Sequence, residues 1–164
     1  MKKKKVEPAE LPGDLSRSDL VERFIRVNHA GEFGAKRIYE GQLAVLKNTK
    51  DAAVIEHMKE QELHHLETFE KLIVERKVRP TVLHPLWNVA GFALGVGTAL
   101  LGPKAAMACT VAVEEVIDEH YADQAAQLTE DEGELKETIN RFRDEELEHL
   151  SLIHISEPTR PLHI

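Results

Sequence analysis

The sequence carries two Glu-x-x-His pairs, Glu62 with His65 and Glu146 with His149, each on the apolar face of a predicted helix. Each pair continues a row of apolar residues spaced by three and four, which is the spacing of one helix face. The rows are Ile55, Met58, Phe69 and Leu72 around the first pair, and Leu135, Ile139, Phe142 and Ile153 around the second. Composition alone predicts roughly one such pair by chance, so the argument depends on position. The position predicts that these side chains point into the core.

Two further glutamates interrupt apolar helix faces in the same way. Glu32 interrupts a row in the first predicted helix, and Glu114 interrupts a row in the third. The first row is Ile25, Ala35, Tyr39, Leu43 and Leu46, and the second is Met107, Val111, Ile117, Tyr121 and Leu128. Glu32 precedes the first Glu-x-x-His pair by 30 residues, and Glu114 precedes the second by 32. The order repeats, so we predict two helix hairpins that each give one lone Glu and one Glu-x-x-His pair to a shared core.

Four carboxylates in one core need positive charge beside them. Burying one unpaired carboxylate costs several kcal/mol, whereas the stability of a whole domain is about 5–15 kcal/mol. Two divalent ions would neutralise the carboxylates, and two imidazoles would give each ion one nitrogen ligand. Cys109 is the only cysteine, which excludes cysteine-rich zinc and iron-sulfur sites. Bridging carboxylates with open positions suit iron that activates O2, and this residue set matches the general pattern of ferritin-like di-iron and di-manganese bundles.

The apolar rows predict an all-α protein, a ferritin-like four-helix bundle built from two helix hairpins. We expect helices over 16–46, from just after Asp51 to near Pro80, and over about 105–128. Ser16 is the expected cap of the first helix, and Thr129 with Glu132 forms a capping-box signature that predicts the start of the fourth. No segment alternates with a period of two over β-branched residues, so no strand is expected.

Residues 80–103 form a segment of 24 residues without Asp, Glu, Lys or Arg. Its glycines and the internal Pro85 make it a poor membrane span, so we expect an apolar Gly-rich crossover that lies in the plane of a membrane interface. Trp87 would sit at that interface, and basic residues on both sides would meet anionic headgroups. These basic residues are Arg76, Lys77, Arg79 and Lys104. The alternative is a buried crossover that links the two hairpins.

The chain length and the net charge limit the number of domains and the class of partner. The chain has 164 residues, which is one domain's worth, and its formal net charge of -8 argues against a nucleic-acid partner. The first residues, MKKKKVEPAELPGDLS, have no apolar stretch after the basic run. We therefore expect a flexible lead-in over 1–15 and not a secretory signal.

Five segments in order resemble the 5-demethoxyubiquinone hydroxylases of ubiquinone biosynthesis. They are RVNHAGEFGAKRIYEGQ, KEQELHHLETF, VRPTVLHPLWNVAGFALGVGTALLG, ACTVAVEEVIDEHY and FRDEELEHL. The resemblance implies a di-iron monooxygenase domain over 16–150 that hydroxylates 5-demethoxyubiquinone at C6, using O2 and electrons from NAD(P)H. It implies six iron ligands, with Glu62 and Glu146 as the bridging pair. The implied ligands are Glu32, Glu62, His65, Glu114, Glu146 and His149.

The resemblance also implies a location and partners. A member of this family is expected as a peripheral membrane protein, on the matrix side of the mitochondrial inner membrane or on the cytoplasmic side of a bacterial membrane. Expected partners are membrane lipid, the ubiquinone-synthesis complex with its lipid-binding partner protein, and further copies of the chain in a homo-oligomer. The apolar segment is expected to form part of a hydrophobic route for the polyprenyl quinone.

His120 and Tyr121 are candidate catalytic residues outside the ligand set. They follow Glu114 by about two helical turns, near enough to orient a ligand or to carry a proton or an electron. The histidines His29, His57, His64 and His84 belong to no comparable pattern, and we expect surface or packing roles for them.

The chain departs from the family after Leu150, where it ends SLIHISEPTRPLHI. Two prolines in this string stop a helix, and the string is similar to a translated sequencing adapter, so we predict a non-native tail over 151–164.

Three other functions fit parts of the sequence. A ferritin-like iron-binding or ferroxidase protein would use the same ligands but has no use for the uncharged segment. A peroxide reductase of the rubrerythrin kind would usually add a Cys-x-x-Cys module, which this chain lacks. A membrane-bound helical scaffold without enzymatic activity is the third.

Overall fold

The computed structural model describes residue 13 and residues 15–156, and this part of the chain is almost entirely helical. Its elements, in chain order, are α1 Arg17–Leu46, α2 Ala52–Glu75, α3 His84–Leu100, α4 Pro103–Gln127, the 3-10 turn η1 Glu130–Glu132, and α5 Gly133–Ser156. No strand occurs within these described residues. The predicted all-α, ferritin-like architecture is therefore confirmed.

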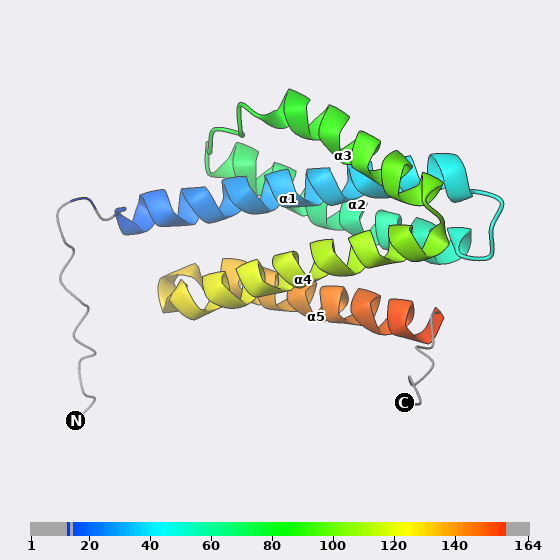
Figure 1. Ribbon diagram of the computed structural model, residues 1–164. Helices are drawn as coiled ribbons and strands as arrows, with labels where there is room; N and C mark the ends of the chain where they lie inside the picture. Colours follow the sequence, from blue (N-terminus) through cyan, green and yellow to red (C-terminus); the bar gives the residue numbers. More distant parts are fainter. Residues whose placement is uncertain (1–12, 14, 157–164) are drawn as a thin grey trace.

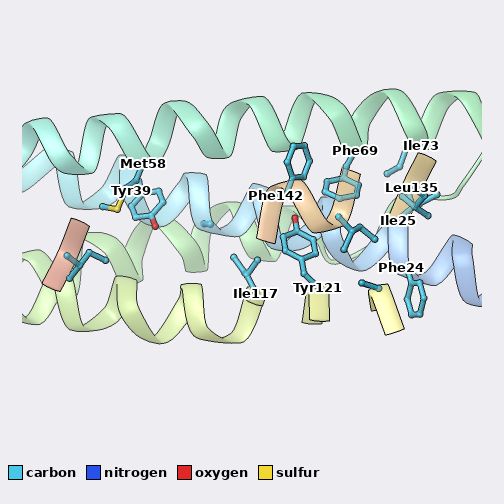
Figure 2. Close-up of a cluster of buried hydrophobic side chains, with 14 of the residues drawn as sticks. Phe24, Ile25, Tyr39, Met58, Phe69, Ile73, Ile117, Tyr121, Leu135 and Phe142 are labelled. Carbon is cyan, nitrogen blue, oxygen red and sulfur yellow. The ribbon is translucent and has the colours of Figure 1, made fainter. Parts of the chain in front are cut away.

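Two antiparallel hairpins make the bundle, α1 with α2 and α4 with α5 (Figure 1). The predicted cap of α1 is present, because the Ser16 hydroxyl accepts a hydrogen bond of 3.2 Å from the backbone N–H of Asp19. Apolar side chains from all four helices meet between the hairpins (Figure 2). The largest of them include Tyr39, Phe69, Tyr121 and Phe142.

The predicted capping box at the start of α5 is wrong. The backbone N–H of Glu132 donates to the carbonyl oxygen of Thr129 at 3.1 Å, which closes the turn η1. The Thr129 hydroxyl makes no cap hydrogen bond as a result, and α5 begins at Gly133. A tight 3-10 turn has replaced the side-chain cap, because both would use the same N–H group.

The uncharged segment forms a fifth α-helix, α3, which lies along α1 on the side away from α5 (Figure 1). Glycines bring the two backbones together. A Cβ atom on Gly95 would lie 2.0 Å from the carbonyl oxygen of Ile38, and one on Gly41 would lie 2.3 Å from that of Phe92. At Gly102 the backbone φ is +112°, which lets the chain turn from α3 into α4. Gly95 therefore serves the packing of α3 on α1, and Gly102 serves the turn.

The outer face of α3 is exposed and apolar. Leu86 is 57% exposed, Val89 69% and Leu100 70%, whereas the face toward α1 buries Gly91, Gly95 and Ala99. The alternative of a buried crossover is therefore wrong for the outer face. Within the described residues, none of the helices combines the length and the apolar character needed to cross a bilayer.

Helix α5 continues six residues past Leu150, the expected end of the native domain. Ile153 is 3% exposed and belongs to the core, as its place in the apolar row predicts. The two prolines of the tail, and almost all of the predicted lead-in, lie outside the described residues. The foreign origin of 151–164 stays a prediction, but its first six residues are part of the helix.

Candidate metal centre

The six predicted ligands meet between the two hairpins. Glu32 comes from α1, the pair Glu62 and His65 from α2, Glu114 from α4, and the pair Glu146 and His149 from α5. Each is at most 1% exposed. Because residues three apart share a helix face, each Glu-x-x-His pair presents both side chains to the other hairpin.

These side chains form two overlapping groups of donor atoms, and within each group the donors lie within 4.8 Å of one another. The group we name position 1 is Glu32, Glu62, His65 and Glu146. The group we name position 2 is Glu62, Glu114, Glu146 and His149. Glu62 and Glu146, the pair expected to bridge two ions, belong to both groups.

The histidines direct Nδ1 at the carboxylates. His65 Nδ1 lies 3.2 Å from Glu146 Oε1 and 3.5 Å from Glu32 Oε2. His149 Nδ1 lies 3.1 Å from Glu146 Oε2 and 3.5 Å from Glu114 Oε1. Each position thus holds one imidazole nitrogen among three carboxylates.

Several buried oxygen and nitrogen atoms of this cluster lack any hydrogen-bond partner in the described part of the chain. They are Glu32 Oε2, both carboxylate oxygens of Glu62, His65 Nδ1, Glu114 Oε2 and Glu146 Oε1. Buried polar atoms are normally satisfied, and leaving one unpaired costs about 1–3 kcal/mol or more. Carboxylate oxygens and imidazole nitrogens are ligands that divalent transition metals accept. The residues present therefore fit two metal ions, one at each position.

Crowding of buried carboxylates shifts their proton affinities. Burial raises the pKa of Glu62 well above its usual range, and the negative charge of Glu146 raises it further. Burial likewise raises the pKa of Glu114 to about 8. Burial also acts to raise the pKa of Glu146, but the adjacent Glu114 and His149 side chains outweigh it and hold that pKa below its usual range.

The two imidazoles take up protons in this acidic setting. Burial acts to lower their pKa values, but the adjacent carboxylates outweigh it. Glu146 and Glu32 beside its Nδ1 raise the pKa of His65 to about 10, and Glu114 and Glu146 raise the pKa of His149 to about 9. Without metal, protons supply the positive charge that the carboxylates require, and a bound cation would displace them.

Two tyrosines tie the hairpins together around the cluster. The Tyr39 hydroxyl of α1 donates to Glu114 of α4, and the Tyr121 hydroxyl of α4 donates to Glu32 of α1. Each tyrosine follows the lone Glu of its own hairpin by seven residues, and each holds the lone Glu of the other. The exchange gives the site an approximate two-fold symmetry.

Two pairs of polar side chains that join α1 and α4 follow the same approximate two-fold symmetry. Asn28 and Gln124 exchange two hydrogen bonds of 2.7 and 2.8 Å, and Gln42 donates to the Thr110 hydroxyl at 3.2 Å. Asn28 and Thr110 each precede a lone Glu by four residues, and the two glutamines follow one by ten. These buried pairs fix the register of α1 against α4.

Aromatic side chains wall the cluster on the side of α2 and α5. Phe142 stacks on His65 with ring centroids 4.0 Å apart. The ring of Phe69 lies 5.8 Å from that of Phe142 and 6.4 Å from that of Tyr121 (Figure 2). This apolar wall keeps water from one side of the ligands.

An apolar pocket of about 690 Å³ lies between α1, α3 and α4 and reaches the cluster. Glu32 and Tyr121 form part of its lining, together with Trp87 and Leu94 of α3. An apolar pocket thus borders the cluster on one side, and aromatic side chains cover it on the other.

The two candidate catalytic residues occupy different places. Tyr121 is 1% exposed and contacts the predicted ligand Glu32. His120 is exposed, lines the pocket, and belongs to neither donor group among the described residues. The catalytic roles of both stay predictions.

Sequence reasoning missed the side chains that hold the ligands. Tyr39 was interpreted only as an apolar core residue, and Gln61 and Glu145 were not singled out. The signal was available in the repeat, because each lone Glu has a Tyr seven residues later and each Glu-x-x-His pair has a polar residue directly before it.

Paired helix hairpins that enclose these carboxylates and histidines define a ferritin-like carboxylate protein. Residues 19–156 match the family model described as "Ubiquinone biosynthesis protein COQ7". The chain belongs to this family, as the sequence resemblance predicted.

Named relatives agree. A 3-demethoxyubiquinol 3-hydroxylase of Rhodospirillum rubrum is 59% identical over 147 residues, covering 89% of this chain and 69% of that protein. An NADPH-dependent 3-demethoxyubiquinone 3-hydroxylase of Dictyostelium discoideum, named as mitochondrial, is 56% identical over 88% of this chain and 68% of its own length. A mitochondrial 5-demethoxyubiquinone hydroxylase of Saccharomyces cerevisiae is 46% identical over 79% of this chain and 63% of its own. The relatives are hydroxylases of ubiquinone biosynthesis, so the chain belongs to a family of enzymes.

Proposed function

We propose that this chain is a di-iron monooxygenase that adds a hydroxyl group to the ring of a demethoxyubiquinone, using O2 and electrons from NAD(P)H. The relatives' names number the ring differently, and the proposal concerns the ring carbon that carries hydrogen, expected above as C6. One observation carries it: an apolar pocket ends at a ligand of a buried two-position metal centre.

Iron would be held at positions 1 and 2, with Glu62 and Glu146 between them. Two bound iron ions would supply O2 activation and redox chemistry, which zinc cannot. The chain's own residues hold the ligands in place. The tyrosine hydroxyls fix the two lone carboxylates, while Phe69 and Phe142 exclude water from the far side.

The pocket suits a quinone ring. Its lining is largely aliphatic and aromatic, and its volume of about 690 Å³ lies within the usual range of small-molecule sites. Glu32 and Tyr121 are its polar contacts with the metal centre, so a ring bound there lies next to position 1. Trp87 and Leu94 place α3 beside the ring and its tail.

The exposed apolar face of α3 supports a peripheral membrane location. We propose that this face rests in a lipid surface, so that the polyprenyl tail stays in lipid while the ring enters the pocket beside α3. The surface would be the matrix side of the mitochondrial inner membrane, or the cytoplasmic side in a bacterium. The same face would serve the ubiquinone-synthesis complex, its lipid-binding partner protein or a second copy of the chain.

The test uses purified protein loaded with iron without oxygen. It is reduced, mixed with a short-tailed demethoxyubiquinone, and exposed to ¹⁸O₂. We expect mass spectrometry to show one labelled oxygen atom in the product, and no product from zinc-loaded protein. Iron oxidation without hydroxylated quinone would favour the ferroxidase alternative and overturn the proposal.

A further inference from the structure

The histidines of the two positions have different outer partners. His65 Nε2 lies 2.6 Å from Glu145 Oε2, and His149 Nε2 lies 2.7 Å from Gln61 Oε1. Both partners directly precede a bridging glutamate, and both reach across to the histidine of the other hairpin. In each case the oxygen accepts the Nε2–H, which leaves Nδ1 as the ring nitrogen that faces the cluster.

At this pair the two sides of the site differ in charge. The tyrosine exchange places the same groups on both sides, and the polar pairs that join α1 and α4 are all uncharged. Here, among the described residues around the cluster, one side has a carboxylate and the other an amide. Position 1 therefore has a negative charge beyond its ligands, and position 2 has none at the matching place.

The extra charge acts on position 1 in two ways. A carboxylate that accepts the Nε2–H makes Nδ1 a more basic metal ligand, and the charge of the carboxylate attracts a cation directly. The Glu145 side chain is 28% exposed, so water screens part of that charge, but His65 is fully buried and transmits the rest. Outer partners of this kind are worth roughly 10–100-fold in metal affinity.

We propose that Glu145 is a positioning residue that makes the two metal positions unequal, so that position 1 fills first and holds its ion more tightly. The proposal rests on the two-metal centre of the proposed function. It assigns to Gln61 the opposite role, that of keeping position 2 the weaker site.

The test is an anaerobic titration of the metal-free protein with Co²⁺, followed by its visible absorption. The variants His149→Ala and His65→Ala each disable one position, so that the other can be measured alone. With His149→Ala, which keeps position 1, we expect an affinity roughly tenfold or more above that with His65→Ala. Equal affinities would overturn the proposal.

Substitutions of the outer partners test the cause. Glu145→Gln keeps a hydrogen-bond acceptor and removes the charge, so it should weaken position 1 roughly tenfold and leave position 2 unchanged. Gln61→Glu should strengthen position 2, and the double substitution should reverse the order of filling. Asp144→Asn, which removes a charge from the exposed neighbour of Glu145, is the control and should change neither affinity.

The outcomes separate this proposal from the proposed function. Two ions that bind equally, with Glu145→Gln behaving like the wild type, would refute the inequality and leave the metal centre standing. A folded wild-type protein that binds no metal would refute the centre itself. If Glu145→Gln fails to fold, the Gln61→Glu variant still tests the proposal, because it adds a charge beside position 2 without removing a contact. An unchanged affinity of position 2 in that variant counts against the proposal.

Discussion

Helix α1 packs against α3 on one side and against the second hairpin on the other, and opposite kinds of residue build the two interfaces. Toward α3 the backbones touch through Gly41 and Gly95. Toward α4 and α5, a donor atom of buried Glu32 lies within 4.8 Å of one of Glu146, and Tyr39 donates to Glu114. The first interface depends on shape, and the second on charge that something must neutralise. Substitutions at the two interfaces should therefore have different effects on the protein.

The largest effect is expected from Glu62→Ala at the charged interface. It removes a ligand shared by both positions, so bound metal should fall below two ions and turnover should fall by more than the roughly hundredfold loss that an outer partner can cause. Metal analysis and the hydroxylation assay measure both. Glu67→Ala, on the exposed side of the same helix, is the matched control. Full metal content in Glu62→Ala would show that Glu62 is not a ligand.

A second effect follows from pH. In the metal-free protein the pKa values of Glu114, His65 and His149 rise from ordinary values of 4.5, 6.5 and 6.5 to about 8, 10 and 9. The folded state then binds more protons than the unfolded state, so the free energy of unfolding falls as pH rises. The contribution of Glu114 is lost between pH 4.5 and about 8, and those of the histidines between pH 6.5 and about 9–10. Each can contribute a slope of up to about 1.4 kcal/mol per pH unit.

Thermal melts from pH 6 to 9 measure this effect. With a chelator present, Tm should fall steadily across that range. With metal bound the protons are already displaced, so the fall should be much smaller. A metal-free Tm that rises toward pH 9 would contradict the described electrostatics.

At the interface between α1 and α3, a larger side chain should destabilise the protein by steric clash. Gly95→Ala places a methyl group 2.0 Å from the Ile38 carbonyl oxygen, so α3 must shift and the protein should lose about 1–3 kcal/mol. Gly97→Ala, two residues on in the same helix, meets nothing within 4 Å and should be neutral or stabilising by up to about 1 kcal/mol. Urea unfolding of the two variants compares them directly. Equal stabilities would show that α3 does not pack closely on α1.

The smallest effect concerns the outer face of α3. Val89 is 69% exposed on α3, and Val74 is 76% exposed on α2. Val89→Asp should weaken binding to vesicles that contain anionic lipid, by roughly tenfold, whereas Val74→Asp should have little effect. A flotation assay with both variants measures this. Equal binding would place the lipid contact elsewhere on the protein.

The sequence was sufficient for the four long helices and for the six clustered side chains, because apolar spacing shows which charged residues face inward. It was insufficient for α3, since glycines lower helix propensity, and the need for Gly95 becomes clear only from its close approach to the backbone of Ile38. The capping box predicted at Thr129 is absent because a 3-10 turn uses the Glu132 N–H group that the capping box would need. Tyr39 was missed as a partner because its acceptor, Glu114, comes from the other hairpin.

The division of donors between the hairpins has a consequence for the order of assembly. Position 1 takes three residues from the first hairpin and Glu146 from the second, while position 2 takes three from the second and Glu62 from the first. A half-folded chain, with one hairpin formed, therefore offers neither position complete. Coordination by all four residues of either position therefore requires the two hairpins to be docked.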